Sequence, residues 1–300
     1  SGDYYLHTRG EGLKHITAAR PNIPAEALHP VTQFDYPARD GLSIPALLTV
    51  PLERAESPKK LPTVLLPHGG PHAYDRMGFD WLAQALAEQG FLVIQPQFRG
   101  SVGFGRELWE AGLGEWGGKM QDDLTDALSV LTEAGMVDPN RVCIVGASYG
   151  GYAALAGATM NSELYRCAAS INGVSDIGKM LKVERQEHGS NHSVISYWKR
   201  SMGGDDFNYD KLDTISPSNH ADKVSAPLLL IHAEQDSVVP IEQSELMRDR
   251  LEKADKPVTF VELKDENHYL MQGESRLKAL EHLLSFLDEH LSDKNLASLQ

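Results

Sequence analysis

The stretch that most constrains this chain is Arg141–Leu155, which reads RVCIVGASYGGYAAL. The residues up to Gly146 are typical of a short buried strand, and small helix-forming residues follow Gly150. Between them, Ser148 lies at the tip of a turn so tight that flanking side chains would collide, which explains the two glycines. Gly-x-Ser-x-Gly between a strand and a helix predicts a nucleophile elbow, whose serine hydroxyl projects clear of a sheet.

Short apolar runs alternate with helical patterns along most of the chain. Two strands around a turn at Asp40-Gly41 come first, and the period then switches repeatedly between strand and helix. The later strands are predicted at residues 63–66, 91–96, 141–146, 166–172, 226–233 and 258–263, and the helices at 78–90, 121–135, 151–160, 240–254 and 274–291. This alternation predicts an α/β fold with a doubly wound, mostly parallel sheet and helices on both faces. The polar region from Asp176 to Asp213 breaks the rhythm, and we interpret it as a small cap-like insertion over the sheet edge.

A nucleophilic serine needs a base and an acid that orients the base. In this fold the order along the chain is Ser, then Asp or Glu, then His. Asp236 follows the strand APLLLIHA, and His268 follows the strand VTFVEL, so both are expected at the same rim as Ser148. Glu234 is an alternative acid, but it lies closer to its strand.

The residues around these candidates are interpreted structurally. His232 lies inside a predicted strand and is expected to be a packed core histidine. Asp265 and Glu266, near the candidate base, are expected to be solvated loop charges.

Acyl transfer also needs two backbone N–H groups that stabilise an oxyanion. The first is expected at Tyr149, the residue after the nucleophile. The second is expected in the glycine-rich loop LLPHGGPHAYD, because glycine lets the backbone approach a ligand closely.

Charge and composition exclude several function classes. The formal net charge of −14 repels phosphate backbones and anionic lipid surfaces, so we expect no nucleic-acid partner and no membrane partner. Cys143 and Cys167 lie in apolar strand-like runs, and we expect two buried thiols and a cytoplasmic location. The spacing of His188 and His192 would suit zinc on a helix, but Gly189 argues for a polar cap loop instead, and no metal or other cofactor is expected.

Taken together, HGGPHA, QFRGSVGFG, GASYGGYAAL, INGVSD, SPSNHADKVSAPLLLIHAEQDSVVP and ENHYL resemble the catalytic domain of the prolyl oligopeptidase family of serine peptidases. The acylaminoacyl-peptidase and dipeptidyl-peptidase branches are the most similar. The resemblance implies an α/β-hydrolase fold, a metal-free mechanism with Ser148, Asp236 and His268 as the triad, and oxyanion donors at Tyr149 and Gly70.

The resemblance also bears on domains and on substrate contacts. Residues 1–25 resemble the exit segment of a missing β-propeller, with no partner strand in the chain, and residues 26–300 form the hydrolase domain. Several family members use an arginine after the NGVSD-like strand to hold a substrate carbonyl. Arg185 and Arg200 lie in that region, neither cleanly in register, and Arg185 is the candidate. Trp198, within the cap-like segment, is expected to contact substrate.

The resulting hypothesis is a serine hydrolase that cleaves short peptides through a covalent acyl-enzyme. The alternatives are a carboxylesterase of the same fold acting on small esters, and an inactive hydrolase-fold domain kept for binding. The expected partner is a short peptide or ester, and an apolar active-site rim would favour a homo-oligomer.

Overall fold

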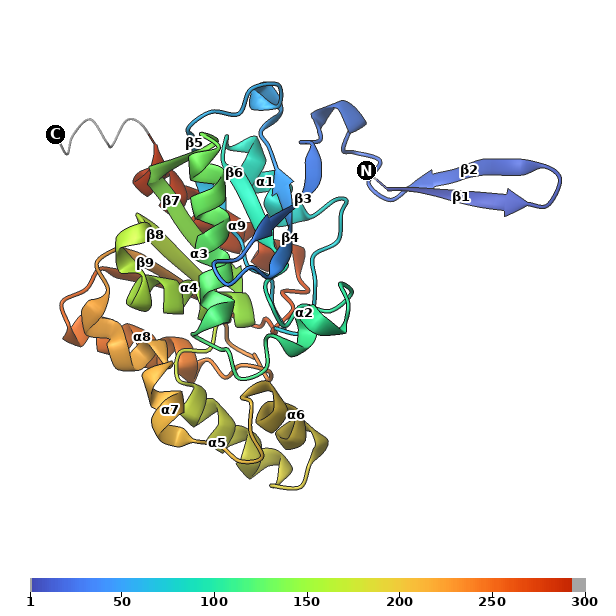
Figure 1. Cartoon of the computed structure of the whole chain (residues 1–300). Coiled ribbons are helices and arrows are strands. Elements are labelled where there is room, and N and C mark those ends of the chain that lie inside the picture. The colour runs from blue at the N-terminus through green and yellow to red at the C-terminus, as the bar shows by residue number, and fades with distance from the viewer. Residues whose placement is uncertain (1, 293–300) are drawn as a thin grey trace.

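The computed structural model describes residues 2–292 and is built around an eight-stranded sheet (Figure 1). Its strands lie in the order β10-β9-β8-β7-β5-β6-β4-β3. They are β3 (Val31–Pro37), β4 (Ser43–Thr49), β5 (Leu61–Leu65), β6 (Leu92–Pro96), β7 (Val137–Ala147), β8 (Cys167–Ile171), β9 (Leu228–Ala233) and β10 (Val258–Leu263). From β10 to β6 all neighbours are parallel, and β4 and β3 are antiparallel at one edge. The predicted α/β-hydrolase architecture is confirmed.

Helices cover both faces of this sheet, as predicted. They are α1 (Trp81–Glu88), α2 (Arg106–Glu110), α3 (Lys119–Glu133), α4 (Tyr149–Met160), α8 (Glu242–Lys253) and α9 (Gly273–Leu291). The side chains of Val142 and Ile144 in β7 belong to the core under α3, α4 and α8. Those of Cys143 and Val145, which alternate with them, belong to the core under α1 and α9. This alternation follows from the two-residue period of a strand, and it explains why the central strands are apolar throughout.

Helix ends follow local signals that the sequence contains. The Asp80 side chain accepts hydrogen bonds from the backbone N–H groups of Leu82 and Ala83, both at 2.9 Å, and so caps α1. Gly90 follows that helix with φ +89°, the left-handed conformation that ends helices. None of the helices formed by residues 2–292 combines the length and apolar character needed to cross a lipid bilayer.

The expectation of two free thiols is wrong. Cys143 of β7 and Cys167 of β8 form a disulfide, and neither cysteine is free. The two residues are directly paired in the parallel ladder, with their Cα atoms 4.8 Å apart. Each run by itself predicts only a buried side chain, because the pairing depends on the register between two strands.

The insertion between Asp176 and Asp213 is present, but the expectation of a polar loop in place of a helix around His188 and His192 is wrong in part. This cap segment contains α5 (Ile177–His188), α6 (Ser193–Ser201) and α7 (Tyr209–Thr214), which gather beyond the edge of the sheet in Figure 1. Gly189 ends α5 with φ +79° rather than preventing the helix. His188 therefore closes one helix, while the His192 side chain caps the next by accepting the N–H of Val194.

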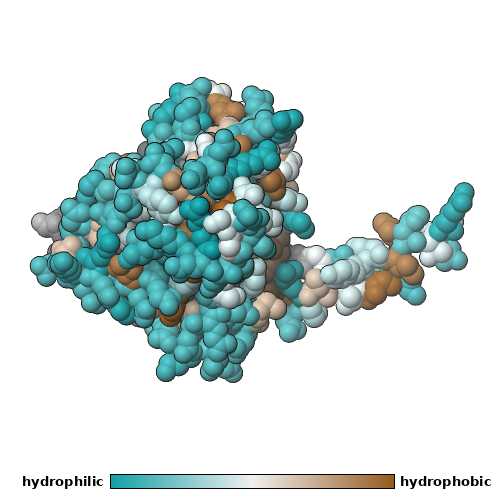
Figure 2. All heavy atoms as spheres, turned by 90° about the horizontal axis from the view of Figure 1, so that it is seen from below, coloured by the Kyte–Doolittle hydropathy of each residue, from teal (hydrophilic) through white to brown (hydrophobic). Residues whose placement is uncertain are grey.

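The first residues form a hairpin, so the expectation that they lack a partner strand in the chain is wrong. Strand β1 (Asp3–Thr8) pairs with β2 (Gly12–Ala18) in an antiparallel register that runs from Asp3 opposite Ala18 to Thr8 opposite Gly12. The hairpin projects away from the rest of the molecule in Figure 1, and brown side chains gather on it in Figure 2. Its exposed apolar residues are Tyr4, Tyr5, Leu6, Leu13 and Ile16.

Candidate active site

Ser148 lies between the end of β7 and the start of α4. Its backbone has φ 59° and ψ −120°, a conformation that costs energy for any residue with a Cβ. Hydrogen bonds to the surrounding backbone maintain this strained conformation. The Ser148 N–H donates to the carbonyl oxygen of Ile171 at 2.9 Å, and the Ser148 carbonyl oxygen accepts the N–H of Tyr152. The serine is therefore fixed at the carboxyl edge of the sheet.

The two flanking glycines are required by contact, as predicted. A Cβ on Gly146 would overlap the carbonyl group of Gly150, and a Cβ on Gly150 would overlap the carbonyl oxygen of Pro67. Strand, elbow and helix can approach this closely only with hydrogen at both positions.

Asp236 and His268 meet at the same edge of the sheet. His268 Nδ1 and Asp236 Oδ2 are 2.6 Å apart, and the Asp236 side chain is fully buried. The other carboxylate oxygen, Asp236 Oδ1, accepts the backbone N–H groups of Val238 and Val239 at 2.8 Å each. Glu234 instead lies on the surface, where its Oε2 accepts the N–H of Asp265 at 3.1 Å. The structure thus favours Asp236 over Glu234 as the partner of the histidine.

His232 supports this pair from within the core, where it is completely buried as predicted. Its Nε2 is 2.9 Å from the carbonyl oxygen of Val239 and its Nδ1 is 2.7 Å from Ser244 Oγ. Burial lowers the pKa of the His232 imidazole. The neutral ring fixes the backbone that donates to Asp236.

The sequence patterns did not predict Asn172 as a residue of the site. Its amide nitrogen Nδ2 donates to the carbonyl oxygen of His268 at 3.0 Å, and its Oδ1 accepts the N–H of Ala233 at 2.9 Å. The residue has φ 49°, a conformation that asparagine tolerates better than most residues. An asparagine directly after a buried strand was the available signal, but its contacts span three strand ends.

Two backbone N–H groups are free to bind an oxyanion. Within residues 2–292, the N–H of Gly70 and the N–H of Tyr149 have no hydrogen-bond acceptor. The first belongs to the glycine-rich loop after β5, and the second is the first N–H of α4. A Cβ on Gly70, which has φ +124°, would come within 2.8 Å of the backbone nitrogen of His72. The positions thus fit the roles that the family resemblance implies for them.

His68 holds the peptide that carries the Gly70 N–H. The His68 Nδ1 is 2.7 Å from the Gly69 carbonyl oxygen, which is the other end of that same peptide unit. Its Nε2 is 2.8 Å from Ser101 Oγ, and burial lowers the pKa of the ring to about 4. The ring stacks on Phe98, and Phe98 in turn packs on Tyr149. One buried stack therefore links the two candidate oxyanion donors.

Trp198 lies behind this stack rather than in an open cleft. It is 9% exposed and packs edge-on against Trp116, which contacts the ring of Tyr149. Its packing supports the elbow, and its predicted contact with substrate stays a prediction.

Arg185 is engaged within the cap. Its guanidinium lies 5.3 Å from the ring of Phe207 and 3.8 Å from a carboxylate oxygen of Asp206. Its proposed hold on a substrate carbonyl also stays a prediction.

The expectation that Glu266 is a solvated loop charge is wrong. The residue is 1% exposed, and its carboxylate accepts the N–H groups of Asn267, Met271 and Gln272. Burial acts to raise the pKa of Glu266, but these three donors and the Ser275 side chain together outweigh it and leave the pKa lowered. Glu266 thereby folds the loop that carries His268.

The zinc alternative finds no support in the described part of the chain. The rings of His188 and His192 stack with centroids 4.9 Å apart, and Glu184 Oε2 is 3.6 Å from His188 Nε2. Within residues 2–292, no group of three or more potential ligands is arranged to hold a metal ion.

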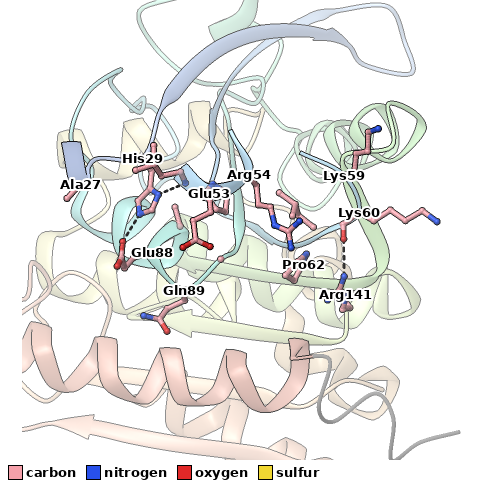
Figure 3. Close-up of a pocket in the computed structure, with 15 residues that line it drawn as sticks. Ala27, His29, Glu53, Arg54, Lys59, Lys60, Pro62, Glu88, Gln89 and Arg141 are labelled. Atoms are coloured by element: carbon pink, nitrogen blue, oxygen red, sulfur yellow. Dashed lines mark hydrogen bonds and ion pairs between the residues drawn. The ribbon is translucent and has the colours of Figure 1, made fainter. Parts of the chain in front are cut away.

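A cavity of about 620 Å³ lies at the amino-terminal ends of the strands, opposite the ends that carry Ser148 (Figure 3). Figure 3 shows the side chains of His29, Glu53, Arg54 and Glu88 around it, and the start of β5 and the end of α1 form part of its wall. The His29 imidazole contacts Glu88 Oε2 at 3.0 Å. Because ligands of open α/β sheets bind at the carboxyl ends of the strands, the candidate site is the edge with Ser148.

Comparison with known proteins agrees with this geometry. The model of the prolyl oligopeptidase family matches residues 77–294. Dipeptidyl aminopeptidase BIII from Pseudoxanthomonas mexicana is 33% identical over 289 residues, covering 91% of this chain and 40% of that protein. Dipeptidyl peptidase family member 6 from Caenorhabditis elegans is 30% identical, covering 96% of this chain and 42% of that protein. The chain thus spans about two fifths of the length of these relatives.

Solved structures show the same fold. A puromycin-hydrolyzing peptidase from Mycobacterium tuberculosis superposes with a TM-score of 0.82 at 26% identity, covering 94% of this chain and 42% of that one. The acylaminoacyl peptidase from Pyrococcus horikoshii gives a TM-score of 0.81 at 24% identity, covering 96% of this chain and 46% of that one.

Proposed function

The chain belongs to the prolyl oligopeptidase family, and we propose that it is a serine hydrolase that cleaves short peptides through a covalent acyl-enzyme. The observation that carries this proposal is the 2.6 Å contact between His268 Nδ1 and buried Asp236 at the edge where the Ser148 elbow ends β7. The relatives named as dipeptidyl and acylaminoacyl peptidases support short peptides as the substrate class.

We assign each group a role from its position. Ser148 Oγ attacks the substrate carbonyl, and the His268 Nε2 takes the serine proton and then gives it to the leaving group. Asp236 fixes the tautomer of the imidazole and stabilises the imidazolium as it forms. The N–H groups of Tyr149 and Gly70 donate to the oxyanion, where preorganised donors contribute most to catalysis.

The side chain of Tyr149 has no part in proton transfer under this proposal. Its hydroxyl lies 3.7 Å from Met120 Sδ, and burial raises the pKa of the phenol well above its usual range. The ring anchors the first turn of α4, so that the residue acts through its backbone.

The experiment is covalent labelling combined with one substitution. A fluorophosphonate probe is expected to label Ser148, and Ser148→Ala is expected to lose labelling and to lower turnover by a factor on the order of 10⁴ to 10⁶ without unfolding the protein. Peptide anilides and a p-nitrophenyl ester with one acyl group, assayed side by side, separate a peptidase from the esterase alternative. An unlabelled protein with neither activity would favour the alternative of a binding domain.

The predicted cytoplasmic location belongs to the proposal as a separate point. That prediction relied partly on free thiols, and the Cys143–Cys167 disulfide removes this support, since disulfides persist mainly in oxidising compartments. Fractionation of cells that produce the protein tests it directly.

A further inference from the structure

A small apolar cavity of about 160 Å³ opens beside the candidate base. Its walls come from five segments: the start of α1, the end of β7, the end of β8, the loop at His268, and the first turns of α9. Residues that define its character are Trp81, Leu82, Ala147, His268, Leu280 and Leu283. It shares no lining residue with the larger acidic cavity that includes Asp236, Val238 and Glu184.

This cavity lies on the side of the site where the leaving group is expected. Ala147 is the residue before the nucleophile, and its side chain is exposed at the cavity. His268, which would protonate the leaving atom, forms part of the wall, whereas the oxyanion donors Gly70 and Tyr149 do not. In acyl transfer the leaving group lies beside the imidazole, because the imidazole must reach its nitrogen.

The walls are held in place and favour an apolar occupant. Arg276 Nη1 donates to the carbonyl oxygens of Leu270 and Met271, at 2.8 and 3.0 Å, and so fixes the loop that follows His268. Trp81 and Tyr269, 41% and 72% exposed, place two aromatic rings at the surface near the opening. Exposed apolar groups beside a concave site are typical of ligand contacts.

We infer that this cavity binds the apolar side chain of the residue that follows the scissile bond, and that Ala147 sets its size. The inference rests on the proposed function, because it needs an acyl-enzyme and a leaving amine. A cavity of this volume accommodates one side chain such as leucine or phenylalanine, and glycine would leave it empty. Burying such a side chain corresponds to a preference of about ten- to a hundredfold.

The test uses the reverse of the leaving step. A p-nitrophenyl ester acylates Ser148, and an amino-acid amide then competes with water for the acyl-enzyme. The amine nitrogen attacks the ester carbonyl, His268 takes the proton from the nitrogen and returns it to Ser148 Oγ, and the products are a new amide and free enzyme. The amine binds at the position that the leaving group occupies in the forward reaction. Because every acceptor competes with water for the same acyl-enzyme, the ratio of aminolysis to hydrolysis measures how well the cavity binds each acceptor side chain.

Leucinamide and phenylalaninamide are expected to give aminolysis ratios about ten- to a hundredfold above that of glycinamide. Ala147→Leu fills the cavity and should make the aminolysis ratios of the three acceptors nearly equal. Leu280→Ala enlarges the cavity and should shift the preference toward phenylalaninamide. Leu277→Ala, an exposed position on the same helix outside the cavity, is the matched control and should keep the wild-type ratios.

Equal ratios for all acceptors in a wild-type enzyme that forms the acyl-enzyme would overturn the inference and leave the proposed function standing. Unchanged ratios in both Ala147→Leu and Leu280→Ala would also overturn it. If the ester yields no acyl-enzyme and the fluorophosphonate does not label Ser148, the proposed function fails, and the inference fails with it.

Discussion

His268 and Asp236 are 32 residues apart in the chain, and their side chains meet at 2.6 Å between Nδ1 and Oδ2. Each follows a parallel strand, β10 or β9, and neighbouring parallel strands end at the same edge of the sheet. The aspartate is oriented by two backbone donors, and the backbone of the histidine is oriented by Asn172. The relationship is therefore built by the sheet and by buried polar contacts rather than by the two side chains alone.

Asp236→Asn is expected to lower kcat/KM by about four orders of magnitude. The asparagine Oδ1 can still accept from Val238 and Val239, so the loop should keep its conformation. Its amide nitrogen would face His268 Nδ1 and favour the wrong tautomer. Steady-state kinetics on a small ester checks this, with circular dichroism to verify the fold. Glu234→Gln removes a neighbouring exposed charge as a control, and an equal loss there would contradict the assignment of Asp236.

His68 is expected to make stability depend on pH in the acid range. The pKa of His68 is about 4 in the folded protein, against about 6.5 in the unfolded chain. Between these values the unfolded chain binds a proton that the folded protein does not, so stability rises with pH. The contribution is complete above pH 6.5 and falls by about 1.4 kcal/mol for each unit of decrease toward pH 4.

Urea unfolding over this pH range compares the wild type with His68→Asn. The variant should show a shallower dependence, and parallel curves would mean that His68 is not buried as a neutral ring. The same variant should lower kcat more than it weakens substrate binding, because the Gly69–Gly70 peptide would lose the group that orients it.

The disulfide between Cys143 and Cys167 is expected to contribute about 3 kcal/mol to stability, as is typical for loops of this length. A reducing agent should lower the melting temperature of the wild type. It should leave the melting temperature of a Cys143→Ala, Cys167→Ala double variant unchanged. The double variant is therefore the control for effects of the reducing agent that do not involve the disulfide. Detection of two free thiols in the unreduced, denatured protein would contradict the disulfide.

Chelators are expected to leave activity unchanged. The proposed mechanism uses only the serine, the imidazole, the carboxylate and the backbone donors, and none of these steps needs a metal ion. Activity after dialysis against EDTA is compared with activity after dialysis against buffer. Loss with EDTA followed by recovery with zinc would require a different mechanism.

The hairpin β1–β2 is expected to cause self-association. A two-stranded hairpin is marginally stable alone, and its free edges can pair with another chain. Leu6 and Leu13 are 53% and 70% exposed, so their apolar surface favours a second copy. Light scattering over a range of concentrations should show a larger mass for the wild type than for a Leu6→Ser, Leu13→Ser variant. Hydrolysis of a small ester serves as the control for intact protein, and a monomeric wild type at all concentrations would refute the expectation.

Much of the site could be predicted from the sequence because its determinants are local. Gly146 and Gly150 reveal the elbow, since the turn leaves no space for side chains between adjacent segments of chain. Asp236 and His268 are predictable because parallel strands bring their following loops to one edge. The alternation of strands and helices determines the two-sided core for the same reason, through the periods of two and 3.6 residues.

The features that only the tertiary structure decided depend on the register between strands and on packing between segments that are distant in the sequence. Cys143 pairs with Cys167 because β7 and β8 align these residues directly, which neither run of sequence indicates. Glu266 is a buried acceptor because its loop folds back over it, whereas its sequence neighbours suggested an exposed charge. The sequence determined which groups can react, since reactivity belongs to side-chain chemistry and short-range geometry. The contacts that hold those groups, from His68, Asn172 and His232, arise only when separate strands lie side by side.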